Sequence, residues 1–150
     1  MADVDATTVR LEIPPRRDHL ALVRLMVSGT LSIERQMAER VEDLLLAVTE
    51  ACANAIQGQQ RLGRDDQIQV SIELGVSGGM DSGRDEVVVT IVDHAGGFEP
   101  GDLSPLPPAT DPGRLRHESG LGLTLMRGHV DEVRFTPTVD GTAVQLVIRT

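Results

Sequence analysis

The sequence predicts an α+β fold: a two-layer α/β sandwich whose mixed, mostly antiparallel sheet carries helices on one face. Two kinds of segment predict it. Some segments alternate polar and apolar residues, as half-buried strands do, and others place apolar residues three and four positions apart, as amphipathic helices do. Strands and helices are partly segregated along the chain, whereas a doubly wound sheet alternates them one by one.

The N-terminal part is predicted to form one strand and two long helices. Residues 8–13 alternate between polar and apolar and are followed by two prolines, which end the strand. Asp18 is expected to cap a helix over residues 18–29. A second helix is expected from about residue 34 to residue 56, because its apolar residues recur at steps of three and four, and Gly58 is expected to stop it.

The rest of the chain is predicted to form four strands and one helix. The elements are a half-buried strand over 68–74, a β-branched central strand over 87–92, a helix over 120–130, and a final hairpin of 133–135 and 143–148. Residues 75–84 are rich in glycine and are expected to form a hairpin loop. Residues 95–119 are rich in proline and glycine, and a segment of this length is either a functional lid or a disordered loop.

The charge and the aromatic content of the chain argue against several kinds of partner. Its 150 residues include 14 Lys and Arg against 23 Asp and Glu, for a formal net charge of −9. Direct binding of nucleic acid is not expected, because neutralising phosphates requires a basic surface. The chain has no Trp or Tyr that could stack on a base or a sugar.

We expect a cytoplasmic protein made of a single domain over residues 1–150, with residues 1–7 as a disordered tail. The chain has no run of about 18 apolar residues, so no membrane span is expected. Its N-terminus is acidic and lacks the apolar stretch of a secretory signal. The single cysteine, Cys52, cannot form an internal disulfide and is expected to be a core thiol.

Glu50 and Asn54 form the first group of candidate functional residues. They are four residues apart in the second predicted helix and therefore project from the same face. Small and apolar residues surround them, so that face lies inward or lines a cleft. The Asn54 amide oxygen could ligate Mg²⁺, and Glu50 could orient or deprotonate an attacking hydroxyl. The competing interpretation is a surface glutamate beside a solvated asparagine.

Asp93 ends the central strand and is followed by Gly96 and Gly97. A carboxylate there could accept a hydrogen bond from an exocyclic amine such as that of adenine, and the glycines would let the backbone turn closely around a flat ring. The competing interpretation is an aspartate that starts a turn.

Gly120 and Gly122 open the third predicted helix and could form a phosphate cradle. A helix N-terminus carries partial positive charge, and glycine lets backbone N–H groups approach an anion closely. The chain has no Gly-x-x-x-x-Gly-Lys-Ser/Thr motif, which excludes a P-loop NTPase. The third glycine and the acidic residue of a Rossmann site are also absent from this stretch.

Taken in order, Glu-x-x-x-Asn-Ala, Asp-x-x-x-Gly and Gly-x-Gly-Leu resemble the N box and the two glycine boxes of the GHKL ATPases, which have the Bergerat, or histidine-kinase-like ATPase, fold. The chain most resembles their anti-sigma-factor serine kinases of the RsbW/SpoIIAB type. Residues 120–126 and 130–133 are similar to the second glycine box and the strand after it, and Gly141-Thr142 matches the strand that closes the nucleotide site. The resemblance extends from Val9 to Ile148.

This resemblance implies ATP and Mg²⁺ as cofactors and a role for each matching residue. Glu50 would be the general base for phosphoryl transfer, and Asn54 would hold Mg²⁺. Asp93 would read the adenine amine, with Thr142 supporting it through water, and Gly97 would allow close approach of the base. Residues 95–119 would be the ATP lid. The phosphates would bind at the helix start, formed by Ser119, Gly120, Leu121, Gly122 and Leu123.

Three positions depart from the family pattern. Ala95 stands where the first glycine box usually has its first glycine. Gln57-Gly58 follows the N box where sporulation-type members have an apolar residue and a histidine. Glu118 stands where those members have an arginine and others an acidic residue, which favours the stress-response branch.

The function implied by the resemblance is that of an anti-sigma factor and ATP-dependent protein serine kinase in transcription regulation. It would sequester a sigma factor as a homodimer and phosphorylate a serine of a STAS-domain anti-anti-sigma protein. The alternative is a nucleotide-responsive binding module without kinase activity; Glu50 argues against it, and Ala95 and Glu118 keep it open. An ATPase domain serving a separate phosphoacceptor, as in histidine kinases, is disfavoured because no phosphoacceptor helix pair precedes it.

Overall fold

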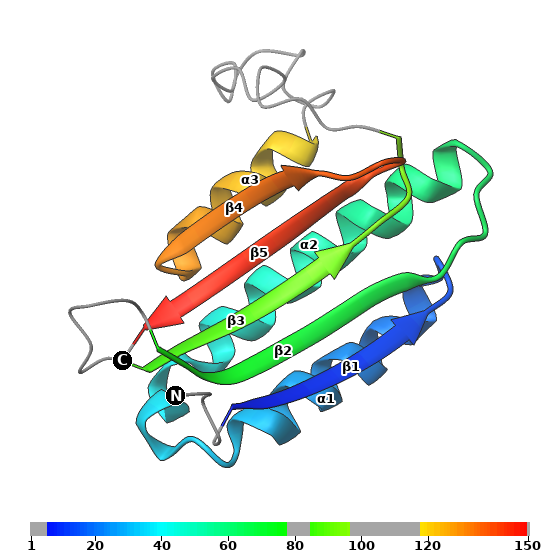
Figure 1. The fold of residues 1–150 in the computed structure, drawn as a ribbon. Helices are drawn as coiled ribbons and strands as arrows, with labels where there is room; N and C mark the ends of the chain where they lie inside the picture. The colour runs from blue at the N-terminus through cyan, green and yellow to red at the C-terminus, as the bar shows by residue number, and fades with distance from the viewer. Residues whose placement is uncertain (1–5, 78–84, 97–117, 150) are drawn as a thin grey trace.

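The computed structural model describes residues 6–77, 85–96 and 118–149, which Figure 1 shows as a coloured ribbon. The loop between the second and third strands, most of the predicted lid and Gly97 lie outside these residues. The structural statements below refer to the described part of the chain.

Five strands form one sheet in the order β1-β2-β3-β5-β4. The four neighbouring pairs are all antiparallel, so the α+β class is confirmed, and the described strands contain none of the parallel pairing of a mixed sheet. β1 starts at Thr7, which the sequence had assigned to the tail. The strands are β1 (Thr7–Ile13), β2 (Ile68–Ser77), β3 (Asp85–Val92), β4 (Glu132–Pro137) and β5 (Thr142–Arg149).

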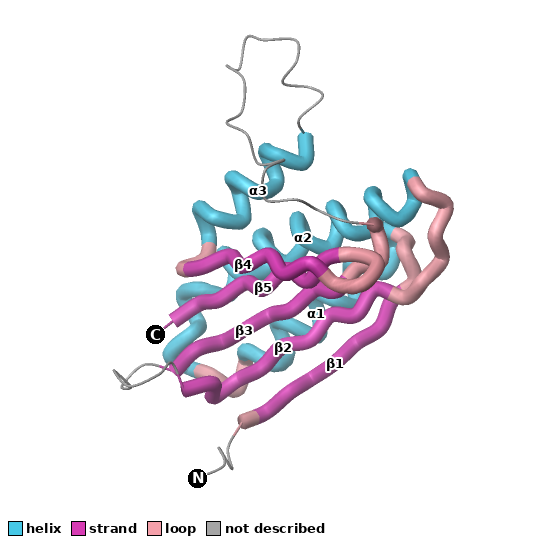
Figure 2. The backbone as a smooth tube through the Cα atoms, turned by 45° about the horizontal axis from the view of Figure 1, so that its top comes forward, coloured by secondary structure: helices cyan, strands magenta, loops and turns pink. Residues whose placement is uncertain are grey.

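Three α-helices cover one face of this sheet, as Figures 1 and 2 show. The helix α1 (Leu20–Leu31) packs on β1 and β2, α2 (Val41–Arg61) on β3 and β5, and α3 (Glu118–His129) on β4. Because α2 also packs against both of the other helices, it is the central element of the helical layer. Its position allows one helix to contribute side chains to two separate places on the domain.

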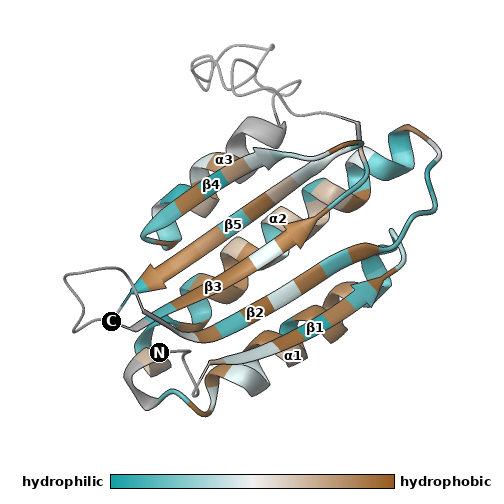
Figure 3. Ribbon diagram, in the orientation of Figure 1, coloured by the Kyte–Doolittle hydropathy of each residue, from teal (hydrophilic) through white to brown (hydrophobic). Residues whose placement is uncertain are grey.

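The core lies between α2 and the middle of the sheet. Val87, Val89 and Ile91 of β3 are at most 2% exposed and belong to the same apolar cluster as the buried face of α2. Figure 3 shows this concentration of apolar residues along β3 and β5. Burial in the middle of a sheet explains the β-branched composition of β3, since such side chains pack well on a pleated surface.

Two predicted helix boundaries are wrong. Asp18 does not cap α1: it lies in the short 3₁₀ turn η1 (Arg17–His19), and its carboxylate is 2.8 Å from the Nδ1 atom of His19. Gly58 does not stop α2, which continues to Arg61. The glycine that follows this helix end is Gly63, whose φ of 64° is the left-handed conformation typical of a residue just after a helix.

The start of α2 also differs from the prediction. A 3₁₀ helix, η2 (Arg35–Arg40), occupies the first part of the region expected to be helical from residue 34, and α2 proper begins at Val41. In the described part of the chain, none of the helices has the length and apolar character needed to cross a membrane.

Candidate active site

Asp93 lies directly after β3 and is held by backbone groups from two segments. Its side chain accepts hydrogen bonds at Oδ1 from the N–H of Ala95, at 2.9 Å, and from the N–H of Thr142, at 3.3 Å. The N–H of Asp93 in turn donates to the carbonyl of Thr142 at 3.0 Å. The bond from Ala95 is the one that an aspartate makes when it starts a turn, and the bond from Thr142 adds a second anchor from another segment, so the carboxylate has a fixed orientation.

Burial changes the acid–base behaviour of this carboxylate. Asp93 is only 9% exposed. Desolvation raises its pKa above the ordinary value, and the N–H bonds from Ala95 and Thr142 partly oppose this rise. Both hydrogen bonds from described residues end on Oδ1, so Oδ2 keeps its capacity to accept an N–H donor from a ligand.

Gly141 allows β5 to approach the Asp93 backbone. A Cβ atom at position 141 would clash with the carbonyl oxygen of Asp93 and would lie 2.7 Å from its carbonyl carbon and 2.9 Å from Oδ1. The turn after Asp93 is joined to the β4–β5 turn as well, because the N–H of Gly96 donates to the carbonyl of Asp140 at 2.9 Å. Glycine is therefore required at 141 by the close approach of two chain segments.

Glu50 and Asn54 meet the N-terminal part of α3. A Cβ atom built on Gly122 would lie 3.0 Å from Asn54 Nδ2, 3.5 Å from Asn54 Oδ1 and 3.4 Å from Glu50 Oε2. The carboxylate, the amide and the glycine thus come together, as their order in the sequence suggested. Neither polar side chain makes a hydrogen bond or ion pair with another residue of the described ranges, so their oxygen atoms are uncommitted there.

The residues that lie beside Gly122 and beside Ala95 all belong to α2. Glu50, Asn54 and Gly58 are spaced four residues apart, so they form a line along one helix face that is about 12 Å long at 1.5 Å per residue. The first two contact Gly122 of α3, and the third contacts Ala95 beside Asp93. One helix therefore spans the distance between the Glu50 group and the Asp93 group.

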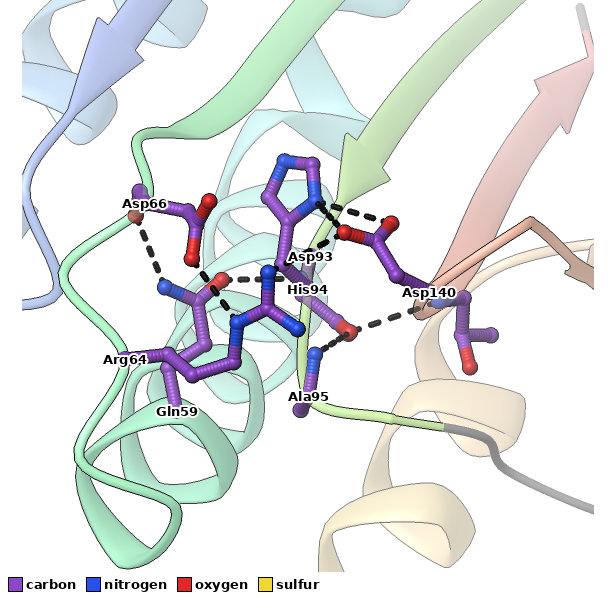
Figure 4. A network of polar contacts seen from close by, with 8 residues as sticks. Gln59, Arg64, Asp66, Asp93, His94, Ala95 and Asp140 are labelled. Carbon is purple, nitrogen blue, oxygen red and sulfur yellow. Dashed lines mark hydrogen bonds and ion pairs between the residues drawn. The ribbon is translucent and has the colours of Figure 1, made fainter.

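A polar network that the sequence did not reveal surrounds the turn after Asp93 (Figure 4). His94 Nδ1 lies 3.0 Å from the Asp140 carboxylate, which also binds the Arg64 guanidinium at 3.2 Å. Arg64 contacts Asp66 at 2.8 Å, and this contact is the main reason that its pKa is raised. The network ties the end of α2, the end of β3 and the β4–β5 turn into one unit.

Gln59 is the buried member of this network. It is 0% exposed, and its amide accepts from the N–H of His94 at 2.8 Å and donates to the carbonyl of Asp66 at 2.7 Å. The helical spacing places it on the same buried face as Ala55 and Ile56. A glutamine at a core position of an amphipathic helix was the one sequence signal that could have identified it.

The other predicted site residues differ in where they lie and in which of their groups could face a ligand. Ser119, Gly120 and Leu121 lie in the first part of α3. The Leu123 side chain is 8% exposed and belongs to the apolar core, which leaves only its backbone to face a ligand. Thr142 is 4% exposed and contacts Asp93 through its backbone. Gly97 is outside the described residues.

Cys52 is a core thiol, as expected. It is 0% exposed, and burial raises its pKa to about 12, so it has no thiolate character at neutral pH. Among the residues that the structure describes, no three His, Cys, Asp or Glu side chains are grouped so that they could hold a metal ion.

Comparison with known proteins agrees with this geometry. A model of the family described as "Histidine kinase-like ATPase domain" matches residues 13–148. The Serine-protein kinase RsbW of Bacillus subtilis (strain 168) is 33% identical over 134 residues, which are 87% of this chain and 78% of the relative. The Serine-protein kinase RsbW of Bacillus licheniformis is 32% identical over 133 residues, 86% of this chain and 78% of the relative.

A solved structure shows the same fold. The SiaB–SiaC complex from Pseudomonas aeruginosa contains a chain that matches with a TM-score of 0.56 and 15% sequence identity, covering 93% of this chain and 89% of that chain. At this level of identity, the similarity establishes a shared architecture and nothing finer.

Proposed function

The chain belongs to the histidine kinase-like ATPase domain family, and on this premise we propose that it is an anti-sigma factor and ATP-dependent protein serine kinase. The observation that carries the proposal is the line of Glu50 and Asn54 on α2, which contacts the glycine start of α3 at one end of the site while Asp93 is held at the other. Such a site can bind a nucleotide by its base and by its phosphates at once.

The Asp93 group is suited to the adenine of ATP. The uncommitted Oδ2 atom of a buried carboxylate is an acceptor for the exocyclic amine, and burial strengthens that hydrogen bond. Thr142 lies against Asp93 and would support the base through water. Gly97 would complete this side of the site.

The Glu50 group is suited to the phosphates and to Mg²⁺. An amide oxygen and a carboxylate converge where the α3 glycines begin, and Mg²⁺ commonly takes only one or two protein oxygens beside phosphate and water. This donor set fits the ion; Asn54 would hold it, and it would neutralise charge on the phosphates. The backbone N–H groups of Ser119 and Gly120 lie in the first turn of α3, where they have no carbonyl partner within the helix, and they would bind the phosphates at the helix N-terminus, with Gly122 leaving room beside them.

Glu50 would act as the general base of phosphoryl transfer. Its Oε2 atom lies beside the glycine start of α3 without a partner among the described side chains, so it can accept the proton of an attacking serine hydroxyl. We infer that the serine belongs to a STAS-domain anti-anti-sigma protein and that the kinase sequesters a sigma factor as a cytoplasmic homodimer. The names of the RsbW relatives support the kinase part of this inference.

The first experiment is transfer of labelled phosphate from ATP to a purified STAS-domain protein from the same organism, for the wild type and for Glu50→Ala. We expect the variant to bind Mg²⁺-ATP with unchanged affinity and to lose phosphate transfer by at least about 100-fold, the usual effect of removing a positioned base. Transfer at the wild-type rate by Glu50→Ala would show that the base is assigned wrongly.

A binding module without kinase activity is the second candidate, and Ala95 is the observation that favours it. Its methyl group lies against Gly58 of α2, in the turn that follows Asp93, where the family pattern usually has a glycine. In that case the wild type would bind ATP and a sigma factor but would transfer no phosphate to any STAS-domain protein.

A further inference from the structure

Gly58 occupies a helical position where glycine is unfavourable. It lies inside α2, and glycine in a helix loses more backbone freedom than alanine while adding no packing. Its φ is not among the positive values, so no turn requires glycine there. The reason for glycine at this position must therefore be a close contact.

That contact is the methyl group of Ala95. A Cβ atom added at Gly58 would lie 2.9 Å from the Cβ of Ala95, which is closer than two carbon atoms normally approach. The Ala95 methyl therefore fills the space that a side chain at position 58 would need. Gly58 and Ala95 are therefore matched in size, because the missing side chain of Gly58 leaves room for the methyl group of Ala95.

Gln59, the next residue of α2, holds the residue before Ala95. Its fully buried amide accepts the N–H of His94 and donates to the carbonyl of Asp66. Because both ends of this buried amide are used, moving His94 would leave polar groups unsatisfied. Gly58 and Gln59 are adjacent in α2, and they thus lie against Ala95 and His94, which are adjacent in the turn.

We propose that Gly58 and Gln59 are positioning residues for Asp93. They hold His94 and Ala95 in place, and the Ala95 N–H donates to Asp93 Oδ1 at 2.9 Å. A displaced turn would move this donor and redirect Oδ2, the oxygen assigned above to the adenine amine. The inference rests on the proposed function, since it concerns how that nucleotide site is built.

The test is a double-mutant cycle in the full chain, with Mg²⁺-ATP affinity measured by calorimetry and stability by urea unfolding. The variants are Gly58→Ala, Ala95→Gly and their combination. Gly29→Ala is the matched control, because Gly29 is also helical and an added Cβ there would meet no atom within 4 Å.

We expect Gly58→Ala to weaken ATP binding by about tenfold and to lower the urea midpoint, although helix propensity alone would raise it. The combined variant should return to within roughly threefold of the wild-type affinity, because the new methyl then replaces the one removed. Gly29→Ala should bind ATP as the wild type does. If Gly58→Ala does not fold, recovery of folding and ATP binding by the combined variant supports the pair.

The proposal is overturned if Gly58→Ala binds ATP as tightly as the wild type, or if the combined variant is no better than Gly58→Ala. A wild type that does not bind ATP would instead overturn the proposed function. In that event the urea series would still show whether Gly58 and Ala95 are matched in size, so the two failures are distinguishable.

Gln59 has its own test. Gln59→Leu removes the acceptor for the His94 N–H while keeping a similar volume, and we expect faster hydrogen exchange of the His94 amide together with weaker ATP binding. Gln60→Leu is the control, since the Gln60 side chain donates its hydrogen bond to the carbonyl of Pro15 and not to a residue of the turn. Equal ATP affinity in the two variants would contradict a positioning role for Gln59.

Discussion

The two ends of the site, the Asp93 end and the Glu50 end, are built differently although α2 serves both. At the Asp93 end, backbone N–H groups of Ala95 and Thr142 already hold the carboxylate, and a buried glutamine holds the turn. At the Glu50 end, Glu50 and Asn54 lie beside Gly122, and the described residues leave their polar atoms uncommitted.

This difference suggests that one end of the site recognises the ligand and the other end carries out the reaction. A recognition group gains affinity when its geometry is fixed before binding, because less ordering is needed on association. Groups that must bind phosphate, coordinate a cation or accept a proton have to keep their oxygen atoms available. The Asp93 end therefore has the features of a preformed recognition site, and the Glu50 end has those of a reaction site.

The largest expected effect is at the close approach of β5 to Asp93. Gly141→Ala would place a methyl group against the Asp93 carbonyl, so the turn must shift. We expect the free energy of unfolding to fall by about 3 kcal/mol, the upper range for overpacking, and ATP binding to be lost. Urea unfolding and calorimetry measure these effects.

A suitable control for Gly141→Ala is Gly128→Ala in α3, where an added Cβ would meet no atom within 4 Å. Its free energy of unfolding should change by no more than about 1 kcal/mol, and in the stabilising direction if helix propensity dominates. If the two variants had equal stability, the close approach at Gly141 would not constrain the site.

A smaller effect on the free energy of unfolding is expected when the buried Asp93 carboxylate is replaced by an amide. Because burial raises its pKa in the folded state, this group favours folding below its unfolded pKa, and the benefit is lost as the pH rises through the folded pKa. Asp93→Asn removes this titration, while the amide oxygen still accepts both N–H bonds. We therefore expect the variant to be at least as stable as the wild type at pH 7.

The measurement is urea unfolding of both proteins between pH 7 and pH 4. The advantage of Asp93→Asn should shrink as the pH falls toward the ordinary range of aspartate, because protonation removes the charge from the wild-type carboxylate. A variant that is less stable than the wild type at pH 7 would mean that the charge stabilises this end of the site.

The sequence predicted the positions of the candidate site residues in the fold better than the contacts that hold them. Spacing along a helix was enough to place Glu50 and Asn54 on one face, and the end of a β-branched run was enough to place Asp93 at a strand terminus. These inferences depend on local periodicity, which the folded chain preserves.

The errors arose where a residue's role depends on a distant segment. Gly58 resembled a helix stop because glycine favours helix ends, but its actual partner is Ala95, 37 positions along the chain. The contacts of Gln59 with His94 and of Arg64 with Asp140 also join different elements. Local patterns contain no information on such pairs, which appear only when the sheet and the helical layer are assembled.

The smallest effect is expected outside both ends, on β4. Hydrogen bonds from Arg134 and Arg149 lower the pKa of Glu132 to about 2, so its stabilising contribution is present above its ordinary pKa and is lost as the pH falls through about 2. Because both ion pairs are partly exposed to solvent, Glu132→Gln should cost only about 0.2–1 kcal/mol at pH 7. The ATP affinity of Glu132→Gln should equal that of the wild type; a marked loss would show that the site is not confined to the two ends.

The measurement that tests the central claim most directly is calorimetric titration of the wild type and Asp93→Asn with Mg²⁺-ATP. We expect the wild type to bind Mg²⁺-ATP and the variant, though folded and at least as stable, to lose at least about tenfold in affinity, because the new amide N–H₂ group opposes the adenine amine. Equal affinity in the two proteins would contradict the assignment of Asp93 as the preformed recognition group.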